Sequence, residues 1–70
     1  MRGWAKVDSI TFIQMAVLYL NSRNEFEDIE HVRKVVGIFL SEKTQLGVAR
    51  SREIEGAMYE QICALNGFNI

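Results

Sequence analysis

The sequence contains one cysteine and one histidine, residue types that often serve as nucleophile and base. Catalysis by the Cys63 thiol would require a base, and His31 is the only imidazole in the chain. Helical periodicity predicts that His31 lies on the outer side of its helix, near Ile38. It places Cys63 at the margin of another helix, opposite Ile54. Because neither residue is predicted to face the other, we expect a protein that is not an enzyme.

A second group of reactive residues is the acidic stretch EFEDIEH, which ends at His31. Asp28 and His31 are spaced for adjacent turns of a helix, as are Glu27 and His31, so either pair could share a metal ion. Two copies in a symmetric dimer could complete such a carboxylate–histidine site. Acidic residues at the start of a helix are the more common explanation of this pattern. We therefore predict neither a metal nor a cofactor.

The elements that would position these residues are predicted to be helices. The chain has 70 residues, of which 49% are hydrophobic, and it contains no proline. This length allows one domain, over residues 1–70. Apolar periodicity predicts an all-α fold with three helices at about 9–22, 25–46 and 51–66. The first helix would be capped by Asp8 or Ser9, although its β-branched residues leave a strand as the alternative.

The ends of the second helix are predicted from local signals. Asn24 can cap its start, with Glu27 closing a capping-box-like pair. Gly47 followed by Val48 is typical of a left-handed helix stop. Gly37 lies inside this helix and indicates a bend, a close helix crossing or a break after Val36.

The third helix is predicted to open at Ser51, and Gly67 followed by Phe68 repeats the glycine stop. One of its polar residues, Gln61, falls on the apolar face between Ile54 and Leu65. If it is buried there, it requires a hydrogen-bond partner, for which Gln14 and Asn21 are candidates.

The segment LGVARSREIEGAMYEQI resembles the turn and recognition helix of a helix-turn-helix. That motif needs a small residue one turn before its glycine and apolar anchors in the helix that follows. With Gly47 as the turn, these positions hold Lys43, Glu53 and Gly56. The charged side chains of Lys43 and Glu53 and the lack of a side chain at Gly56 do not allow the apolar helix contacts of the motif, so the resemblance fails in detail.

Basic residues nevertheless gather in the middle of the chain. Residues 31–52 contain five Lys or Arg and one Glu, and acidic segments flank them. Lys43, Arg50 and Arg52 are therefore expected to contact an anion or an acidic partner. The alternative is ordinary support within a helix, such as Glu30 with Lys34.

The first helix carries more apolar circumference than two neighbouring helices can cover. Phe12, Met15 and Tyr19 on this helix, together with Ile38 on the second, are therefore predicted to bind a partner. Alternatively, Trp4 and the C-terminal residues FNI could fold over this face and shield it.

These observations predict a small interaction module that acts as a regulator, inhibitor or adaptor. Its expected partners are a second copy, giving a homodimer, and a larger target protein. The alternative is a DNA-binding transcriptional regulator that uses the basic helix start. The apolar stretch Ile10–Leu20 is too short to span a membrane and lacks a signal-peptide cleavage site. Together with the single cysteine, this favours the cytoplasm.

Overall fold

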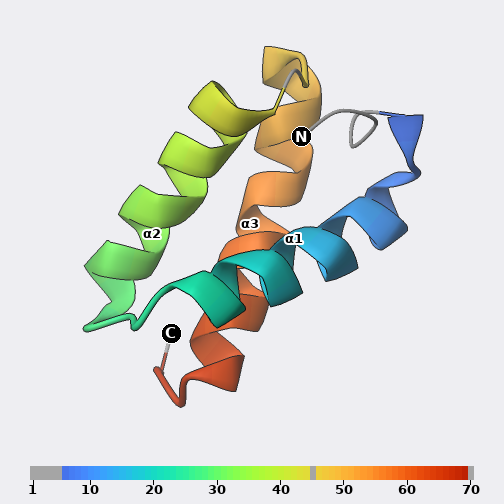
Figure 1. Ribbon diagram of the computed structural model, residues 1–70. Coiled ribbons are helices and arrows are strands. Elements are labelled where there is room, and N and C mark those ends of the chain that lie inside the picture. The colour runs from blue at the N-terminus through green and yellow to red at the C-terminus, as the bar shows by residue number, and fades with distance from the viewer. Residues whose placement is uncertain (1–5, 45, 70) are drawn as a thin grey trace.

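A computed structural model describes residues 6–44 and 46–69 of the chain. It contains α1 (Ser9–Arg23), α2 (Ile29–Ile38), a π-helical segment η2 (Phe39–Lys43) and α3 (Val48–Leu65). The predicted all-α, three-helix fold is confirmed, and the strand alternative for the first segment is wrong. Figure 1 shows α2 and α3 side by side and antiparallel, with α1 crossing them.

The start of α1 is fixed by Asp8, one of the two predicted caps. The Thr11 backbone N–H donates to Asp8 Oδ2 at 2.9 Å, and the Thr11 hydroxyl donates to Asp8 Oδ1 at 2.7 Å. The first bond gives a partner to a backbone N–H of the first turn, which has none within the helix. The second bond holds the Asp8 carboxylate in the position that accepts it.

The second helix begins later than predicted, at Ile29. Its cap is Asp28, whose Oδ1 accepts from the His31 N–H at 2.8 Å. Asn24 instead ends α1, where its side-chain amide donates to the Leu20 carbonyl oxygen at 2.9 Å. The prediction that Asn24 caps this helix was wrong. Asn24 and Asp28 are both residue types that are favoured as N-caps, and the sequence does not show which of them starts the helix.

A break after Val36 is also excluded, because α2 continues through Gly37. A Cβ added at Gly37 would lie 4.0 Å from Glu55 Oε2 of α3, so this glycine faces a neighbouring helix. The change in helix type comes after Ile38, in η2, where the turn widens. The helical run ends at Lys43, and the Thr44 hydroxyl donates to the Leu40 carbonyl oxygen at 2.7 Å.

Gly47 does not stop the second helix, contrary to prediction. Its backbone is extended, with φ −68° and ψ 162°, and it is the N-cap of α3. Accordingly, α3 begins at Val48 and not at Ser51. The stop at the other end of α3 is confirmed, because Gly67 has φ +75°, the only positive φ among the described residues.

The last turn of α3 forms a Schellman motif around Gly67. The Phe68 N–H donates to the Cys63 carbonyl oxygen at 2.9 Å, and the Gly67 N–H donates to the Ala64 carbonyl oxygen at 3.2 Å. Phe68 then packs against the core.

All three helices contribute to one hydrophobic core, and α3 contacts both of the others. Two aromatic rings link α1 to η2, since the Phe12 and Phe39 centroids are 6.4 Å apart. Each fully buried large side chain contributes about 1.5–3 kcal/mol to folding. The buried apolar residues are Phe12, Ala16, Val17, Leu20, Val32, Val36, Phe39, Leu40, Ile54, Met58, Ile62 and Cys63.

Candidate functional site

The predicted partner-binding residues do not share one surface. Phe12 is fully buried against Phe39 and is therefore unavailable to a partner. The prediction failed there because the apolar arc of one helix does not reveal which part its neighbours cover. Met15 is partly exposed on α1. Trp4 lies outside the described residues.

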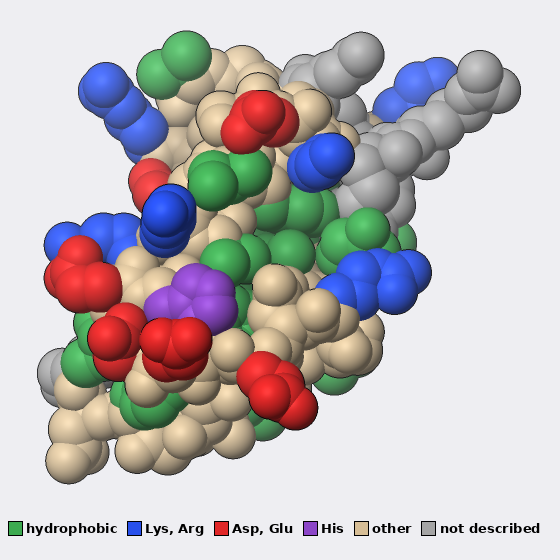
Figure 2. Space-filling model, turned by 60° about the vertical axis from the view of Figure 1, so that its left-hand side comes forward, with side chains coloured by type: hydrophobic (Ala, Val, Ile, Leu, Met, Phe, Trp, Pro, Cys, Tyr) green, Lys and Arg blue, Asp and Glu red, His purple; other side chains and the backbone are tan. Residues whose placement is uncertain are grey.

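Tyr19, Ile38 and Lys43 do come together. They line a pocket of about 340 Å³, which we call the α1–α2 pocket. Two of these residues were predicted to bind a partner and the third to contact an anion. Figure 2 shows hydrophobic side chains in this part of the surface, with basic side chains beside them. The full lining is Tyr19, Leu20, Arg23, Asn24, Val35, Ile38, Phe39 and Lys43.

Tyr19 is held in this pocket from two sides. Its ring centroid lies 5.8 Å from that of Phe39, and the Arg23 guanidinium carbon lies 4.4 Å from the Tyr19 centroid. The guanidinium therefore makes a cation–π contact that restricts it to the edge of the pocket. Ile38 is 42% exposed on the opposite helix.

A second surface, the α1–α3 groove, was not predicted from the sequence. It has a volume of about 520 Å³ and is lined by Gln14, Val17, Leu18, Gln61, Ala64 and Leu65. Leu18 is 67% exposed and Leu65 is 58% exposed. The signal for Leu18 was present, because it falls on the polar strip of the first helix among Thr11, Gln14 and Asn21.

Gln61 is exposed in this groove, so the condition under which it would need a hydrogen-bond partner is not met. Met58 and Ile62 of the same helix are fully buried in the core, whereas Gln61 lies at the surface. The predicted partner Asn21 instead accepts from the Asn66 side-chain amide at 2.9 Å. Gln14 lines the same groove as Gln61.

The two predicted anion-contacting arginines of α3 have different surroundings. Arg50 points inward, where its guanidinium donates to the Val7 carbonyl oxygen and lies 5.9 Å from the Phe12 ring centroid. Arg52 is exposed. Lys43 borders the α1–α2 pocket, whose lining includes neither arginine.

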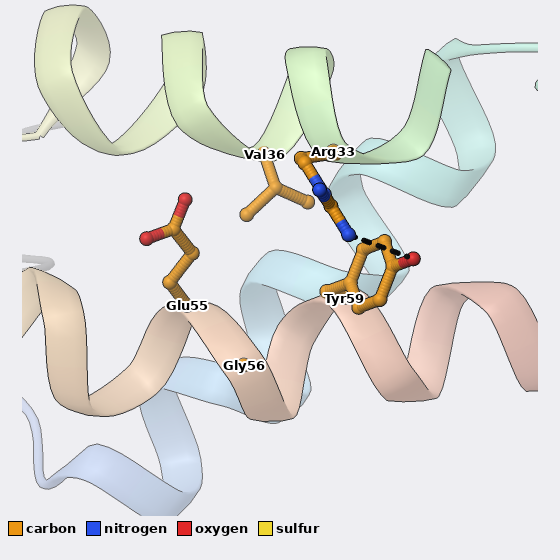
Figure 3. Close-up of a pocket in the computed structure, with 5 residues that line it drawn as sticks. All are labelled: Arg33, Val36, Glu55, Gly56 and Tyr59. Atoms are coloured by element: carbon orange, nitrogen blue, oxygen red, sulfur yellow. Dashed lines mark hydrogen bonds between the residues drawn. The ribbon is translucent and has the colours of Figure 1, made fainter. Parts of the chain in front are cut away.

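A third pocket, of about 290 Å³, lies between α2 and α3 (Figure 3). The Arg33 guanidinium stacks 5.2 Å from the Tyr59 ring centroid, and its Nη2 donates to the Tyr59 hydroxyl at 3.4 Å. This hydrogen bond, followed by the charges of Tyr59, Glu30 and Glu55, raises the pKa of Arg33. The contact between Arg33 and Tyr59 ties α2 to α3 along one side of the pocket.

The residues considered for catalysis have structural roles. Cys63 is fully buried and not at a helix margin, and burial raises the pKa of its thiol. His31 packs on Phe26 with centroids 5.4 Å apart. Its Nδ1 accepts from the Glu27 N–H at 3.1 Å.

The acidic segment of residues 25–30 leads into α2 and includes its first residues, and Figure 2 shows acidic side chains gathered in the lower half of that face. Asp28 is occupied as the helix cap. No set of three or more metal-binding side chains comes together in the part of the chain that the structure describes.

Comparison with known proteins gives no relative: the chain matches no family model, and neither a curated sequence nor a solved structure is similar to it. None of the helices within residues 6–44 and 46–69 has both the length and the apolar content needed to cross a bilayer.

Proposed function

We propose that this protein is a non-enzymatic protein-binding module that pairs with a second copy of itself through the α1–α3 groove. The observation that carries the proposal is the exposure of Leu18 and Leu65 on either side of that groove. Large apolar side chains that border a concave apolar surface are typical of association sites.

The composition of the groove favours a second copy as the partner. A twofold interface places the same patch on both subunits, so any charge in it comes close to a like charge. The residues that line the groove carry no charge. Each leucine can therefore enter the groove of the other subunit without electrostatic repulsion, while Gln14 and Gln61 supply polar contacts at the edge.

The expected dimer is weak. Burying the exposed parts of two leucines on each subunit contributes about 4–7 kcal/mol in total. Association costs at least about 4 kcal/mol in lost translational and rotational freedom. The remaining contacts therefore determine the affinity, and we expect dissociation in the micromolar range or above.

Sedimentation velocity across a wide range of protein concentration tests this proposal. The unmodified chain should shift from monomer to dimer as its concentration rises, and Leu18→Gln with Leu65→Gln should remain monomeric. Val48→Gln is the matched control, because Val48 is 69% exposed and lies outside the groove. A chain that stays monomeric at every concentration would remove the proposal.

The wider role that we propose is that of a regulator, inhibitor or adaptor of a larger protein. We place it in the cytoplasm, because a chain with a single cysteine has no internal disulfide to form in an oxidising compartment.

The alternative function, DNA binding, has less support because Arg50 is directed towards Val7 and Phe12. Arg52 and Lys43 alone would neutralise few phosphates. DNA binding would show an affinity that falls steeply with salt concentration. Pairing through the uncharged groove should change little over the same range of salt.

A further inference from the structure

The α1–α2 pocket has a different chemistry from the α1–α3 groove. Its floor is apolar, formed by Leu20, Val35 and Phe39, and the partly exposed Ile38 extends it to the surface. Arg23 and Lys43 border this floor and are both exposed. None of the residues that line the pocket is acidic. The pocket therefore combines an apolar floor with two positively charged side chains at its border.

We propose that the α1–α2 pocket binds an acidic amphipathic segment of a partner protein. One apolar side chain of that segment lies on Leu20, Val35 and Phe39, and carboxylates beside it pair with Arg23 and Lys43. The proposal rests on the proposed role as a protein-binding module and is independent of the pairing groove, which involves other residues.

The position of Arg23 supports a carboxylate as the ligand group. Its guanidinium is already placed over the Tyr19 ring, 4.4 Å from the centroid. A guanidinium held in this way loses less side-chain entropy on binding and presents its donors in the fork that fits a carboxylate. Lys43 adds a second charge on the other helical segment.

The partial negative charge at two helix ends near the pocket repels an anion, but the positive charges of Arg23 and Lys43 are larger. α1 ends at Arg23 and η2 ends at Lys43, so both direct the carbonyl end of a helix dipole towards this region. A helix end carries about half a negative charge, whereas each cation carries a full positive one. The Asn24 amide also covers the Leu20 carbonyl oxygen at the end of α1.

The acidic segment of a second copy does not fit this pocket. Residues 25–30 have the required charge, but their apolar side chains, Phe26 and Ile29, pack against the core of their own chain. A nucleic acid is also a poor match, because two cations around an apolar floor neutralise few phosphates. A flexible acidic peptide with a free apolar side chain satisfies both parts of the surface.

Selection from a displayed library of random peptides tests the proposal with the full chain immobilised. Enriched peptides should contain more acidic than basic residues, together with at least one large apolar residue. One enriched peptide, labelled with fluorescein, then serves as the probe in anisotropy titrations. Chemical-shift changes in the unmodified protein should centre on Tyr19, Ile38 and Lys43.

Variants separate the charge from the apolar floor. Arg23→Glu with Lys43→Glu should weaken binding of the probe by about tenfold or more, and Ile38→Asp should weaken it similarly. The matched controls are Arg52→Glu and Val48→Asp, two exposed positions outside the pocket that should leave the affinity unchanged. A peptide in which lysine replaces the acidic residues should bind the double variant more tightly than it binds the unmodified chain.

Three results would overturn the proposal: selection without enrichment of acidic residues, equal weakening by the controls, or shift changes centred on Leu18 and Leu65. Shift mapping needs no variant, so it decides the question even if a substitution prevents folding. A monomeric chain that binds the probe would remove the self-pairing proposal alone. A dimer that selects no acidic peptide would remove this one alone.

Discussion

The Arg50 guanidinium donates a hydrogen bond to the Val7 carbonyl oxygen, and this contact joins the beginning of α3 to the residues just before α1. The same side chain lies over the Phe12 ring, 5.9 Å from its centroid. A cation in the first turn of a helix is disfavoured by the helix dipole. Here the carbonyl oxygen and the aromatic face compensate for that position.

The Arg50 contact leads to a prediction about stability. Arg50→Gln should lower the free energy of unfolding by about 1–2 kcal/mol, because a charge-assisted hydrogen bond is lost and a partly buried carbonyl group remains. Arg52→Gln, two residues away and exposed, should change it by less than about 0.5 kcal/mol. Urea denaturation followed by circular dichroism measures both. Equal effects of the two substitutions would show that the Val7 contact contributes nothing.

Asp8 predicts a dependence of stability on pH. Hydrogen bonds from the Thr11 backbone N–H and then from the Thr11 hydroxyl lower the pKa of Asp8 below its ordinary value of 3.8. A carboxyl with a lowered pKa stabilises the fold fully above its unfolded pKa, and this contribution is lost as the pH falls through the lowered folded value.

Thermal unfolding of the unmodified chain and Asp8→Ala should therefore differ at pH 7 and converge towards pH 2. Asp8→Asn supplies the control, because asparagine is an equally good N-cap without a titrating group. Its melting temperature should stay near that of the unmodified chain at pH 7. A difference between Asp8→Ala and the unmodified chain that is constant over this pH range would contradict the linkage.

The helices were predictable from the sequence because their signals are local. Apolar periodicity, the Asp8 cap and the Gly67 stop each depend on residues within a few positions of one another. Local signals failed where two candidates competed. Asn24 and Asp28 can each cap a helix, and Gly47 precedes a helix as readily as it ends one.

The proposed binding surfaces depend on how the helices pack, and no local sequence pattern contains that information. Helical periodicity identified Phe12 and Tyr19 as surplus apolar residues, but the crossing of α1 over the others buries one and leaves the other at a pocket. Leu18 falls on the polar strip of the first helix, and only the packing of α1 against α3 places it in the same groove as Leu65. Arg50 donates a hydrogen bond to Val7, which lies 43 positions away in the chain.

The buried thiol of Cys63 gives a third prediction. Because Cys63 is fully buried and burial raises the pKa of its thiol, the reactive thiolate is both scarce and inaccessible in the folded chain. Labelling with a disulfide reagent at pH 8 should be slow and should accelerate on addition of urea. The same chain in strong denaturant gives the unprotected rate. Rapid, complete labelling under native conditions would show that α3 opens at this position.

Two glycines of α3 predict opposite responses to the same substitution. Gly67→Ala should destabilise the fold by about 1 kcal/mol, because φ is +75° at this position and a Cβ is disfavoured there. Gly56 lies inside α3, and a Cβ added to it would meet nothing within 4 Å.

Gly56→Ala should therefore stabilise the fold by about 0.5–1 kcal/mol, since alanine loses less backbone entropy in a helix. Urea denaturation of the two variants beside the unmodified chain measures both changes, and the shared substitution makes each the control for the other. The Schellman stop at Gly67 would be contradicted if Gly67→Ala were neutral. A destabilising Gly56→Ala would mean that a Cβ at Gly56 meets a neighbouring group in the pocket between α2 and α3 (Figure 3), contrary to the open space found there.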